Sequence, residues 1–416
     1  MKILLSAFLF CILSLAAYAQ TSDSSNNNYL NVYLDEQYGY EEYIKTEIPF
    51  VNYVRDRFQS QVHILITSQQ TGSGGSNYTI FLLGQSEFEG KNDTLHFISN
   101  SINTYDESRA GVVQVLKMGL LPYVAKISST IPIKISYTAP ETSEEKEAVD
   151  KWHHWVFSIN TFVNAYLTSN YTSYSLSGGL SGNKITEKWK LLFSTDANYN
   201  TNLYDLGDGD TYESFNNSTY SSAVIVKSFN KHWSYGGAAS HTTSTYSNYD
   251  LRVDISPAIE YDVFPYSEST TKLLTFLFTI GPEYHNYTDT TIFNETEEFL
   301  LRNRFQISLN MTQKWGDISL GLSESNYIPD FDKNSIGCFT SLNWRIVEGL
   351  SFNGYFNIYF IKDQFNLAKG DLSQEEILLQ IKEQETDFTF STYFGLSYTF
   401  GSIYNNIVNP RFYGYY

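Results

Sequence analysis

The sequence predicts a mainly β protein, an antiparallel up-and-down transmembrane β-barrel of about twelve strands that follows a small α+β domain. The pattern is clearest at residues 388–400, where almost every even position is apolar or aromatic and most odd positions are small or polar. Successive side chains of a strand point to opposite faces, so this segment has one apolar face and one polar face. The pattern recurs back to about residue 153, and an export signal stands at the start of the chain. Together these observations are typical of a barrel in an outer membrane.

The export signal is predicted at residues 1–19. Lys2 supplies the positive start, residues 3–15 the apolar run, and Ala17-Tyr18-Ala19 the small-residue cleavage site. Residues 20–28 are rich in Ser and Asn, which indicates a flexible leader. Cys338 is the only cysteine after the signal, so no internal disulfide is expected and stability must come from packing and backbone pairing.

Charge and hydropathy narrow the class of protein further. The formal net charge of −18 argues against a nucleic-acid partner, because phosphate binding needs clustered Lys and Arg. No segment after the signal has 18 consecutive apolar residues, so we expect no membrane-spanning helix. Strands evade that test because only every second residue faces lipid. The 34 Tyr and 29 Phe residues fit aromatic girdles at the membrane surfaces.

Residues 29–139 are predicted to form a periplasmic α+β domain that can bury its own core. Its expected elements are a strand at 31–34, a helix at 41–57 kinked or ended at Pro49, strands at 62–67, 78–83 and 94–98, and a helix at 106–126. Residues 140–151 are charged and lack apolar periodicity, so they are predicted to be a linker.

The barrel is predicted at residues 152–400 and a periplasmic tail at residues 401–416. Alternation places its strands at 153–168, 171–182, 188–201, 212–228, 232–246, 249–264, 271–286, 298–312, 315–327, 334–346, 349–362 and 386–400. Each exceeds the roughly 9–11 residues that a tilted strand needs to cross a membrane. The last strand is expected to pair with the first, which removes the open edges.

A soluble β-sandwich would also alternate, and two observations favour the membrane barrel. The connections at one end are short, whereas several at the other end are long, notably 200–213, 287–297 and 363–385. Tryptophan, which prefers the bilayer interface, is expected to form a girdle at the short-turn, periplasmic end. The six residues of this girdle are Trp152, Trp155, Trp189, Trp233, Trp315 and Trp344.

Charged side chains at polar-face positions are expected to face the lumen. They are Lys190, Asp196, Arg252, Asp254, Glu260, Asp262, Arg302, Arg304 and Arg345. Both signs occur, which leaves open a closed interior held by ion pairs and a narrow polar pore. Twelve strands give a lumen between the packed eight-stranded and the open sixteen-stranded cases.

No catalytic residue, cofactor site or metal site is predicted. The acidic spacing at residues 205–210 makes Asp205, Asp208 and Asp210 weak metal candidates, but the downstream Glu of a calcium loop is missing. The glycines at 72–75 lack the Lys-Ser/Thr of a phosphate loop, so they indicate a hairpin.

The histidines also favour a non-enzymatic interpretation. His153 and His154 are better explained by an interfacial position than by a metal. His241 falls on the lipid-facing parity, and no Ser-His-acid order stands out around His285 near the external rim.

The segments Val32-Tyr33-Leu34-Asp35, 44–57, 62–67 and 71–75 resemble an uncharacterised family of exported Gram-negative proteins. In that family such a domain precedes an outer-membrane-type barrel. The resemblance covers residues 31–125 and implies compartment and fold, but it carries no catalytic motif. The order of elements also resembles loosely, in topology alone, the amino-terminal domain of the periplasmic protein TolB.

We therefore expect an outer-membrane barrel that is an anchor or a narrow polar channel, with both termini of the mature chain in the periplasm. Residues 29–139 would bind a periplasmic partner, for example by strand addition along 29–34, or would gate the lumen. Residues 375–383 look helical and would cap the barrel mouth or dock a surface partner. Outer-membrane lipid is the other expected partner, and neither nucleic acid nor a cofactor is expected. The alternatives are an outer-membrane hydrolase acting on lipid or surface glycan, and a soluble secreted β-protein.

Overall fold

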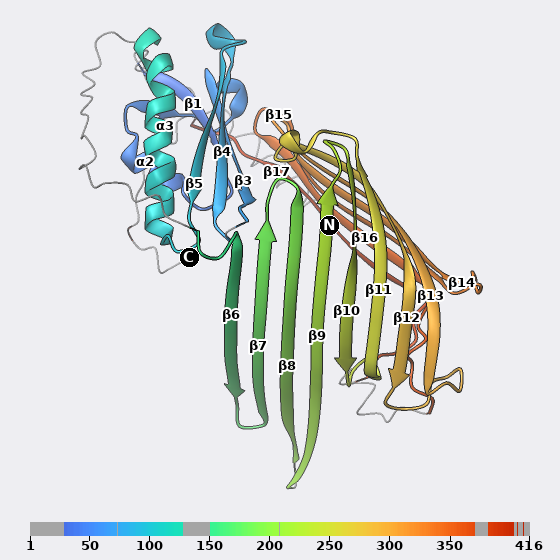
Figure 1. Cartoon of the computed structure of the whole chain (residues 1–416). Helices are drawn as coiled ribbons and strands as arrows, with labels where there is room; N and C mark the ends of the chain where they lie inside the picture. Colours follow the sequence, from blue (N-terminus) through green and yellow to red (C-terminus); the bar gives the residue numbers. More distant parts are fainter. Residues whose placement is uncertain are drawn as a thin grey trace, which may run out of the picture.

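The computed structural model describes residues 29–72, 74–127, 150–207, 209–370, 382–402, 406 and 411. The predicted signal peptide, the leader, most of the linker and tail, Asp208 and most of the helix at 375–383 lie outside these residues. Two sheets make up the described chain, a small mixed sheet followed by a large antiparallel one (Figure 1).

The small sheet and its helices form the α+β domain (residues 29–127). Its elements are β1 (Leu30–Asp35), α2 (Glu41–Glu47), β2 (Val51–Tyr53), the 3-10 turn η2 (Arg57–Gln59), β3 (Val62–Gln70), β4 (Ser76–Gly84), the 3-10 turn η3 (Ser86–Phe88), β5 (Asn92–Ser99) and α3 (Tyr105–Ile127). The strand order is β2-β1-β3-β4-β5, with β1 parallel to both neighbours and the other pairs antiparallel. Helix α3 buries Val112, Leu116 and Leu120 against this sheet, because these residues recur on one helical face.

Helix α3 is long and apolar enough to cross a membrane by length and composition alone. Its buried face and its contacts with β4 and β5 identify it as the core helix of the α+β domain. The apolar composition of the segment therefore serves packing.

Two predictions for the α+β domain are wrong in part. The helix expected at 41–57 ends at Glu47, because Pro49 cannot donate to a continuing helix and disfavours helical backbone before it. Val51 and Tyr53 then belong to β2, which was not predicted. Strand β1 lies between β2 and β3, so residues 29–34 are not the free edge expected for strand addition.

The large sheet contains twelve antiparallel strands, each paired with its sequence neighbours. They are β6 (Trp155–Leu167), β7 (Tyr171–Ile185), β8 (Trp189–Gly207), β9 (Asp210–Ser228), β10 (Trp233–Ser244), β11 (Tyr249–Asp262), β12 (Lys272–Tyr287), β13 (Glu297–Gln313), β14 (Gly316–Ile328), β15 (Asn334–Val347), β16 (Leu350–Ile361) and β17 (Phe388–Tyr398), with the 3-10 turn η4 (Tyr266–Glu268) before β12. The predicted mainly β class, with twelve up-and-down strands after a small α+β sheet, is confirmed. No backbone pairing joins β6 to β17 within the residues that the structure describes, so closure into a barrel is not shown.

The segment 200–213 is not the long loop that was predicted. Strands β8 and β9 remain paired as far as Gly207 and Asp210, which makes this connection a tall hairpin. Gly207 and Gly209 both have φ of +86°, a left-handed conformation that glycine adopts without strain. Polar and aromatic cross-strand pairs such as Tyr204 with Tyr212 extend the ladder, and their weak alternation hid it from the sequence pattern.

The large sheet curls so that one face turns inward. Phe365, after β16, packs on Tyr327 of β14 with ring centroids 4.6 Å apart. Thr291, after β12, forms a backbone bridge with Ala368. Because β13, β14 and β15 lie between β12 and β16 in the sheet, these contacts require strong curvature. We call residues 363–369 the inner loop and the face they cover the inner face.

The α+β domain lies at the end of the large sheet where β6 begins (Figure 1). A Cβ placed on Gly72 would come within 2.9 Å of Cβ of Ile185, at the end of β7. On the other side of the curl, Arg345 of β15 pairs with Asp35 of β1. The domain therefore extends across the end of the curled sheet. We call this end the domain end and the opposite end the distal end.

Candidate functional site

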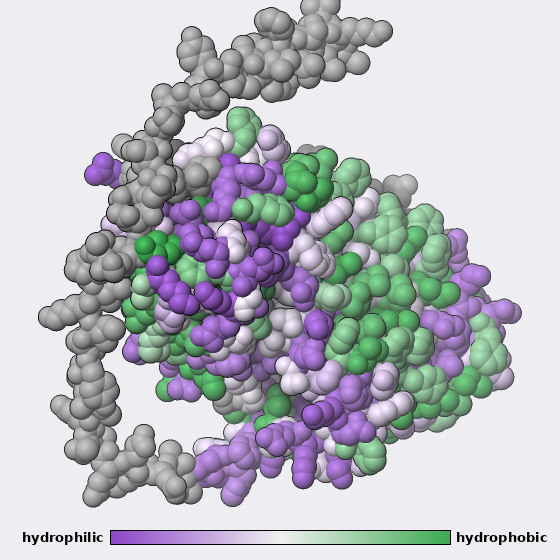
Figure 2. All heavy atoms as spheres, turned by 90° about the horizontal axis from the view of Figure 1, so that it is seen from above, coloured by the Kyte–Doolittle hydropathy of each residue, from purple (hydrophilic) through white to green (hydrophobic). Residues whose placement is uncertain are grey.

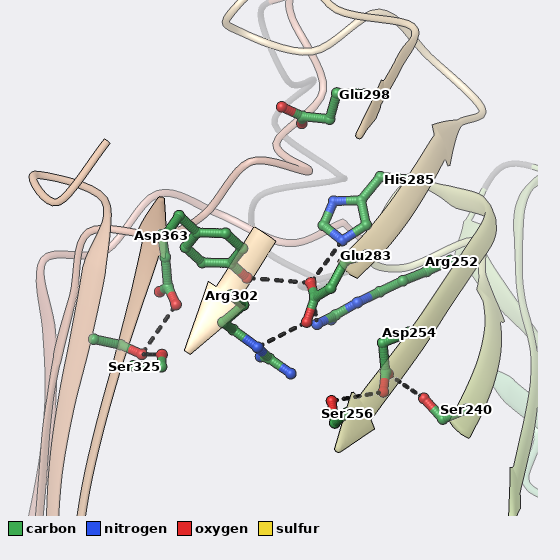
Figure 3. A network of polar contacts seen from close by, with 12 residues as sticks. Ser240, Arg252, Asp254, Ser256, Glu283, His285, Glu298, Arg302, Ser325 and Asp363 are labelled. Carbon is green, nitrogen blue, oxygen red and sulfur yellow. Dashed lines mark hydrogen bonds and ion pairs between the residues drawn. The ribbon is translucent and has the colours of Figure 1, made fainter. Parts of the chain in front are cut away.

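A buried carboxylate, Glu283 of β12, organises the distal part of the inner face (Figure 3). Its Oε2 accepts from Nη2 of Arg252 on β11 at 3.1 Å and from Nε2 of His285 at 3.0 Å. Its Oε1 forms an ion pair with Nε of Arg302 on β13 at 2.7 Å. The hydroxyl of Tyr327 on β14 donates to the same carboxylate at 3.4 Å. We call these five residues the Glu283 network. It connects four successive strands through one side chain.

The register explains why these side chains meet. Arg252 stands opposite His285, and Arg302 stands opposite Gly281 on the neighbouring strand. Directly opposed residues of an antiparallel pair share a face, and residues two apart on one strand do as well. Glu283 therefore lies among the guanidinium groups of both adjacent strands.

The network continues toward the distal end through His285. Its Nδ1 lies 3.0 Å from the hydroxyl of Tyr287, which in turn donates to the carboxylate of Glu298 on β13. The ring of Tyr249 packs edge-on against His285 with centroids 5.3 Å apart. Glu283 and His285 are each 1% exposed, so both side chains lie almost without access to solvent.

The inner loop covers the Glu283 network from the distal end. Asn248 donates from Nδ2 to the carbonyl of Asn366 at 2.9 Å, and the backbone N–H of Ile292 donates to Leu367 at 2.9 Å. At its start, Asp363 accepts from the hydroxyl of Ser335 at 3.0 Å. The loop is thereby fixed to neighbouring β15 and, across the curl, to the connections that precede β11 and follow β12.

The nine predicted lumen charges all fall on the inner face by register. The structure brings Arg252 and Arg302 together around Glu283, while Asp254 accepts from Ser240 and Ser256 beside them (Figure 3). Arg304 lies one position further along the inner face of β13. The other predicted charges, Lys190, Asp196, Glu260, Asp262 and Arg345, lie away from this cluster.

Sequence reasoning missed Glu283, His285 and the inner loop as parts of one site. The available signal was the alternation of β12. Glu283 and His285 stand at odd positions, as Thr279 and Gly281 do, and odd positions of this strand fall on its inner face. The loop carried no periodic pattern that could have placed Phe365 over the network.

A second polar cluster joins the α+β domain to the large sheet. Asp35 accepts from Nη1 and Nη2 of Arg345 at 2.5 and 2.6 Å, a bidentate pair, and lies 3.1 Å from Nε2 of His63. The guanidinium of Arg345 also lies over the ring of Tyr33, 5.3 Å from its centroid. We call Asp35, His63 and Arg345 the docking cluster.

Burial alone would raise the pKa of the Asp35 carboxyl, but the hydrogen bonds from His63 and Arg345 hold it below its ordinary value. Burial lowers the pKa of His63, and this outweighs the opposing effect of Asp35. At neutral pH the cluster therefore contains a carboxylate, a neutral imidazole and a guanidinium.

The six tryptophans all lie at the domain end of the large sheet. Trp152 and Trp155 stand at the start of β6, Trp189 and Trp233 begin β8 and β10, Trp315 precedes β14, and Trp344 pairs with Gly316 at the start of β14. Trp152, Trp189, Trp233 and Trp344 are exposed.

Two of the three weak metal candidates, Asp205 and Asp210, lie at the tip of the β8–β9 hairpin. Asp205 accepts from the backbone N–H of Gly207 at 2.9 Å, which stabilises the turn, and Asp210 stands opposite Gly207. Within the described residues, which exclude Asp208, no group of three His, Cys, Asp or Glu side chains could hold a metal ion.

Replacing Glu283 with Gln should destabilise the large sheet by about 3 kcal/mol, because the partly buried Arg252 and Arg302 keep their charges and lose their shared, fully buried partner. The readout is the urea midpoint of the full-length protein in detergent micelles. Glu324→Gln, the same change at an exposed position of β14, is the matched control and should have little effect. Equal midpoints for the two variants would contradict a stabilising role for the network.

Docking of the α+β domain should weaken on acidification. Asp35 and His63 have lower pKa values in the folded protein than in the free chain, so the unfolded or undocked state binds more protons as the pH falls. The loss should begin below about pH 6.5 through His63 and continue below about pH 4 through Asp35. Fluorophores on cysteines introduced at Gln69 and Ser269, whose side chains are 3.3 Å apart, would report separation.

Asp35→Asn should weaken docking at neutral pH and flatten the lower stage of this pH profile, whereas Asp93→Asn on exposed β5 should leave both unchanged. An identical pH profile in the unmodified protein, Asp35→Asn and Asp93→Asn would show that the docking cluster does not control docking.

No protein-family model matches the chain, and no curated protein matches it either. Among solved structures, the chain has a distant likeness to a chain described as "Bacterial polysaccharide outer membrane secretin", with 12% sequence identity and a TM-score of 0.26. That alignment covers 59% of this chain and 91% of the other chain. A likeness of this size carries no argument about function, so the site must be interpreted from its own residues.

Proposed function

We propose that the chain is an outer-membrane β-barrel that acts as a narrow polar channel, with a periplasmic α+β domain that gates its lumen. The observation that carries the proposal is the separation of the two faces of the large sheet. The outer face presents large apolar side chains such as Ile255, Phe305 and Phe390, each exposed, while the inner face holds the charged and hydroxyl-bearing residues. Figure 2 displays broad hydrophobic areas in the half of the view that the large sheet occupies.

Exposed apolar residues on this scale favour lipid as the surrounding solvent. Soluble monomers rarely expose contiguous apolar patches beyond a few hundred Å². Here exposed large apolar residues occur on every strand from β6 to β17. A lipid-facing outer side and an aqueous inner side match the alternation that membrane barrels require.

Insertion into a membrane would also favour closure of the large sheet into a barrel. Each unpaired backbone group in the hydrocarbon region costs several kcal/mol, so spanning sheets close on themselves. Strand β6 begins at the domain end and β17 finishes there, so the two free edges run antiparallel as a closing pair must. We propose that β6 and β17 pair in the membrane, as the even strand number allows.

The proposed orientation places the domain end in the periplasm. The six tryptophans at this end would then lie at the inner bilayer interface, where an indole ring is buried and its N–H stays hydrated. The tall β8–β9 hairpin and the inner loop would face the exterior. The α+β domain would cover the periplasmic mouth through the docking cluster.

A periplasmic protein partner for the α+β domain remains part of the proposal. Strand β5 is a free edge of the small sheet, and Ile98 at its end is 61% exposed. A partner strand could add along β5 by backbone hydrogen bonds. The proposal includes no catalytic step.

The full-length protein should appear in the outer-membrane fraction and migrate faster on a denaturing gel before boiling than after boiling. Closed barrels give this behaviour because their backbone pairing survives detergent at room temperature. Recovery of the protein as a soluble periplasmic monomer, with no heat-dependent shift, would contradict the proposal.

Phe365→Ala should raise single-channel conductance in planar bilayers severalfold. The ring is 7% exposed and packs on Tyr327 and His285, so its loss should loosen the inner loop and open the distal mouth. Phe331→Ala, an exposed aromatic in the β14–β15 connection, is the control and should conduct as the unmodified protein does. Unchanged conductance in Phe365→Ala would show that the inner loop is not the constriction.

A further inference from the structure

The inner face of β13 to β16 lines an open cavity of about 460 Å³, which we call the inner cavity. This volume falls in the roughly 300–1,000 Å³ range of small-molecule sites. The cavity extends from Arg304 and Ser335 near the Glu283 network to Asn310 and Ser319, which also line a cavity beside the α+β domain. It lies on the proposed path through the barrel, between the inner loop at the distal end and the α+β domain at the domain end.

Small and polar residues line the floor of the inner cavity. Strand β14 contributes Ser319, Gly321, Ser323 and Ser325, which are consecutive residues of its inner face. Small side chains leave room above the sheet, and serine hydroxyls can donate or accept hydrogen bonds. This floor suits a ligand that carries hydroxyl groups on its own surface.

One wall of the cavity is aromatic. Phe339 of β15 and Tyr359 of β16 line it, and Phe339 packs edge-on against Tyr355 with centroids 5.6 Å apart. Tyr359 lies across Gly337, where any Cβ would collide with the ring. The glycine thus permits a tyrosine pose in which the ring is 39% exposed. Aromatic faces attract the partly positive C–H groups of a saccharide ring.

The opposite wall carries a guanidinium. Arg304 of β13 is exposed, and it makes no hydrogen bond or ion pair with any residue in the part of the chain that the structure describes. Its neighbours Arg252 and Arg302 both form ion pairs with Glu283. Arg304 is therefore free to receive an anion from the cavity. A guanidinium binds a carboxylate through two parallel hydrogen bonds.

We propose that the inner cavity binds an acidic saccharide, with Arg304 holding the carboxylate, the serines of β14 contacting hydroxyl groups and Tyr359 stacking on a sugar ring. A simple anion would use Arg304 and neither of the other walls. A neutral sugar would leave the guanidinium without a partner. The inference rests on the proposed function, because it assigns a solute class to the lumen of the proposed barrel.

The test uses full-length protein in detergent micelles and isothermal titration calorimetry. The probes are a galacturonic acid trisaccharide, a neutral galactose trisaccharide and acetate. We expect the acidic trisaccharide to bind at least about tenfold more tightly than either of the others, since only this probe can pair with the guanidinium and also contact the serine floor and the aromatic wall. This comparison in the unmodified protein needs no variant.

Variants then assign the contacts. Arg304→Gln should weaken binding of the acidic trisaccharide about tenfold or more and leave the neutral one unchanged. Tyr359→Ala should weaken both trisaccharides. Arg109→Gln, the same change in the α+β domain away from the inner cavity, is the matched control.

Equal affinity for acetate and the acidic trisaccharide would reduce the cavity to an anion site and overturn the inference. So would equal affinity for the acidic and neutral trisaccharides, or an acidic trisaccharide that binds Arg304→Gln as tightly as the unmodified protein. A protein that conducts in bilayers but binds no trisaccharide overturns this inference alone. Selective binding by a protein that never reaches the outer membrane supports the inference and overturns the proposed function.

Discussion

The two-residue period of the β-strand is the constraint on which the rest of the structure depends. Because alternate side chains point to opposite faces, a sequence that alternates over twelve consecutive strands divides one sheet into an apolar outer face and a polar inner face. The register transmits this division across the sheet, since opposed residues of each antiparallel pair share a face. Asp196, Arg252, His285 and Glu298 thus fall on one side, although they come from four strands.

A charged side chain on the inner face needs an oppositely charged or hydrogen-bonding partner wherever the curl of the sheet buries it away from water. A carboxylate buried as deeply as Glu283 is stable only if opposite charges and hydrogen bonds compensate its burial. Here Arg252 and Arg302 supply the charges, and Arg252, His285 and Tyr327 supply the hydrogen bonds. Such a network favours one curvature and one position of the inner loop, because Phe365 packs on the rings that surround it. Alternation therefore defines the inner face, and the Glu283 network fixes the arrangement of side chains upon it.

The sequence was sufficient where structure follows from local period. The twelve strands, their order and the inner position of Arg252 and Arg302 could be predicted because alternation is a property of each segment alone. It failed at residues 51–53 and 200–213, where a three-residue strand and a weakly alternating hairpin are determined by pairing with distant residues. It could not predict that Asp35 meets Arg345, because 310 residues separate them and neither segment carries a sign of the other.

The inner loop and the α+β domain cover opposite ends of the inner face, and they are attached in different ways. This difference favours opening at the domain end. The inner loop follows β16 directly, is hydrogen-bonded to Asn248 and Ile292 across the curl, and buries Phe365 and Leu367. The α+β domain meets the sheet largely through polar side chains, such as Asp35 with Arg345 and Gln69 with Ser269. Interfaces with this polar character resemble transient contacts between domains. Acidification or a competing periplasmic partner needs to replace only a few such contacts, whereas moving the inner loop requires the aromatic packing over the Glu283 network to break.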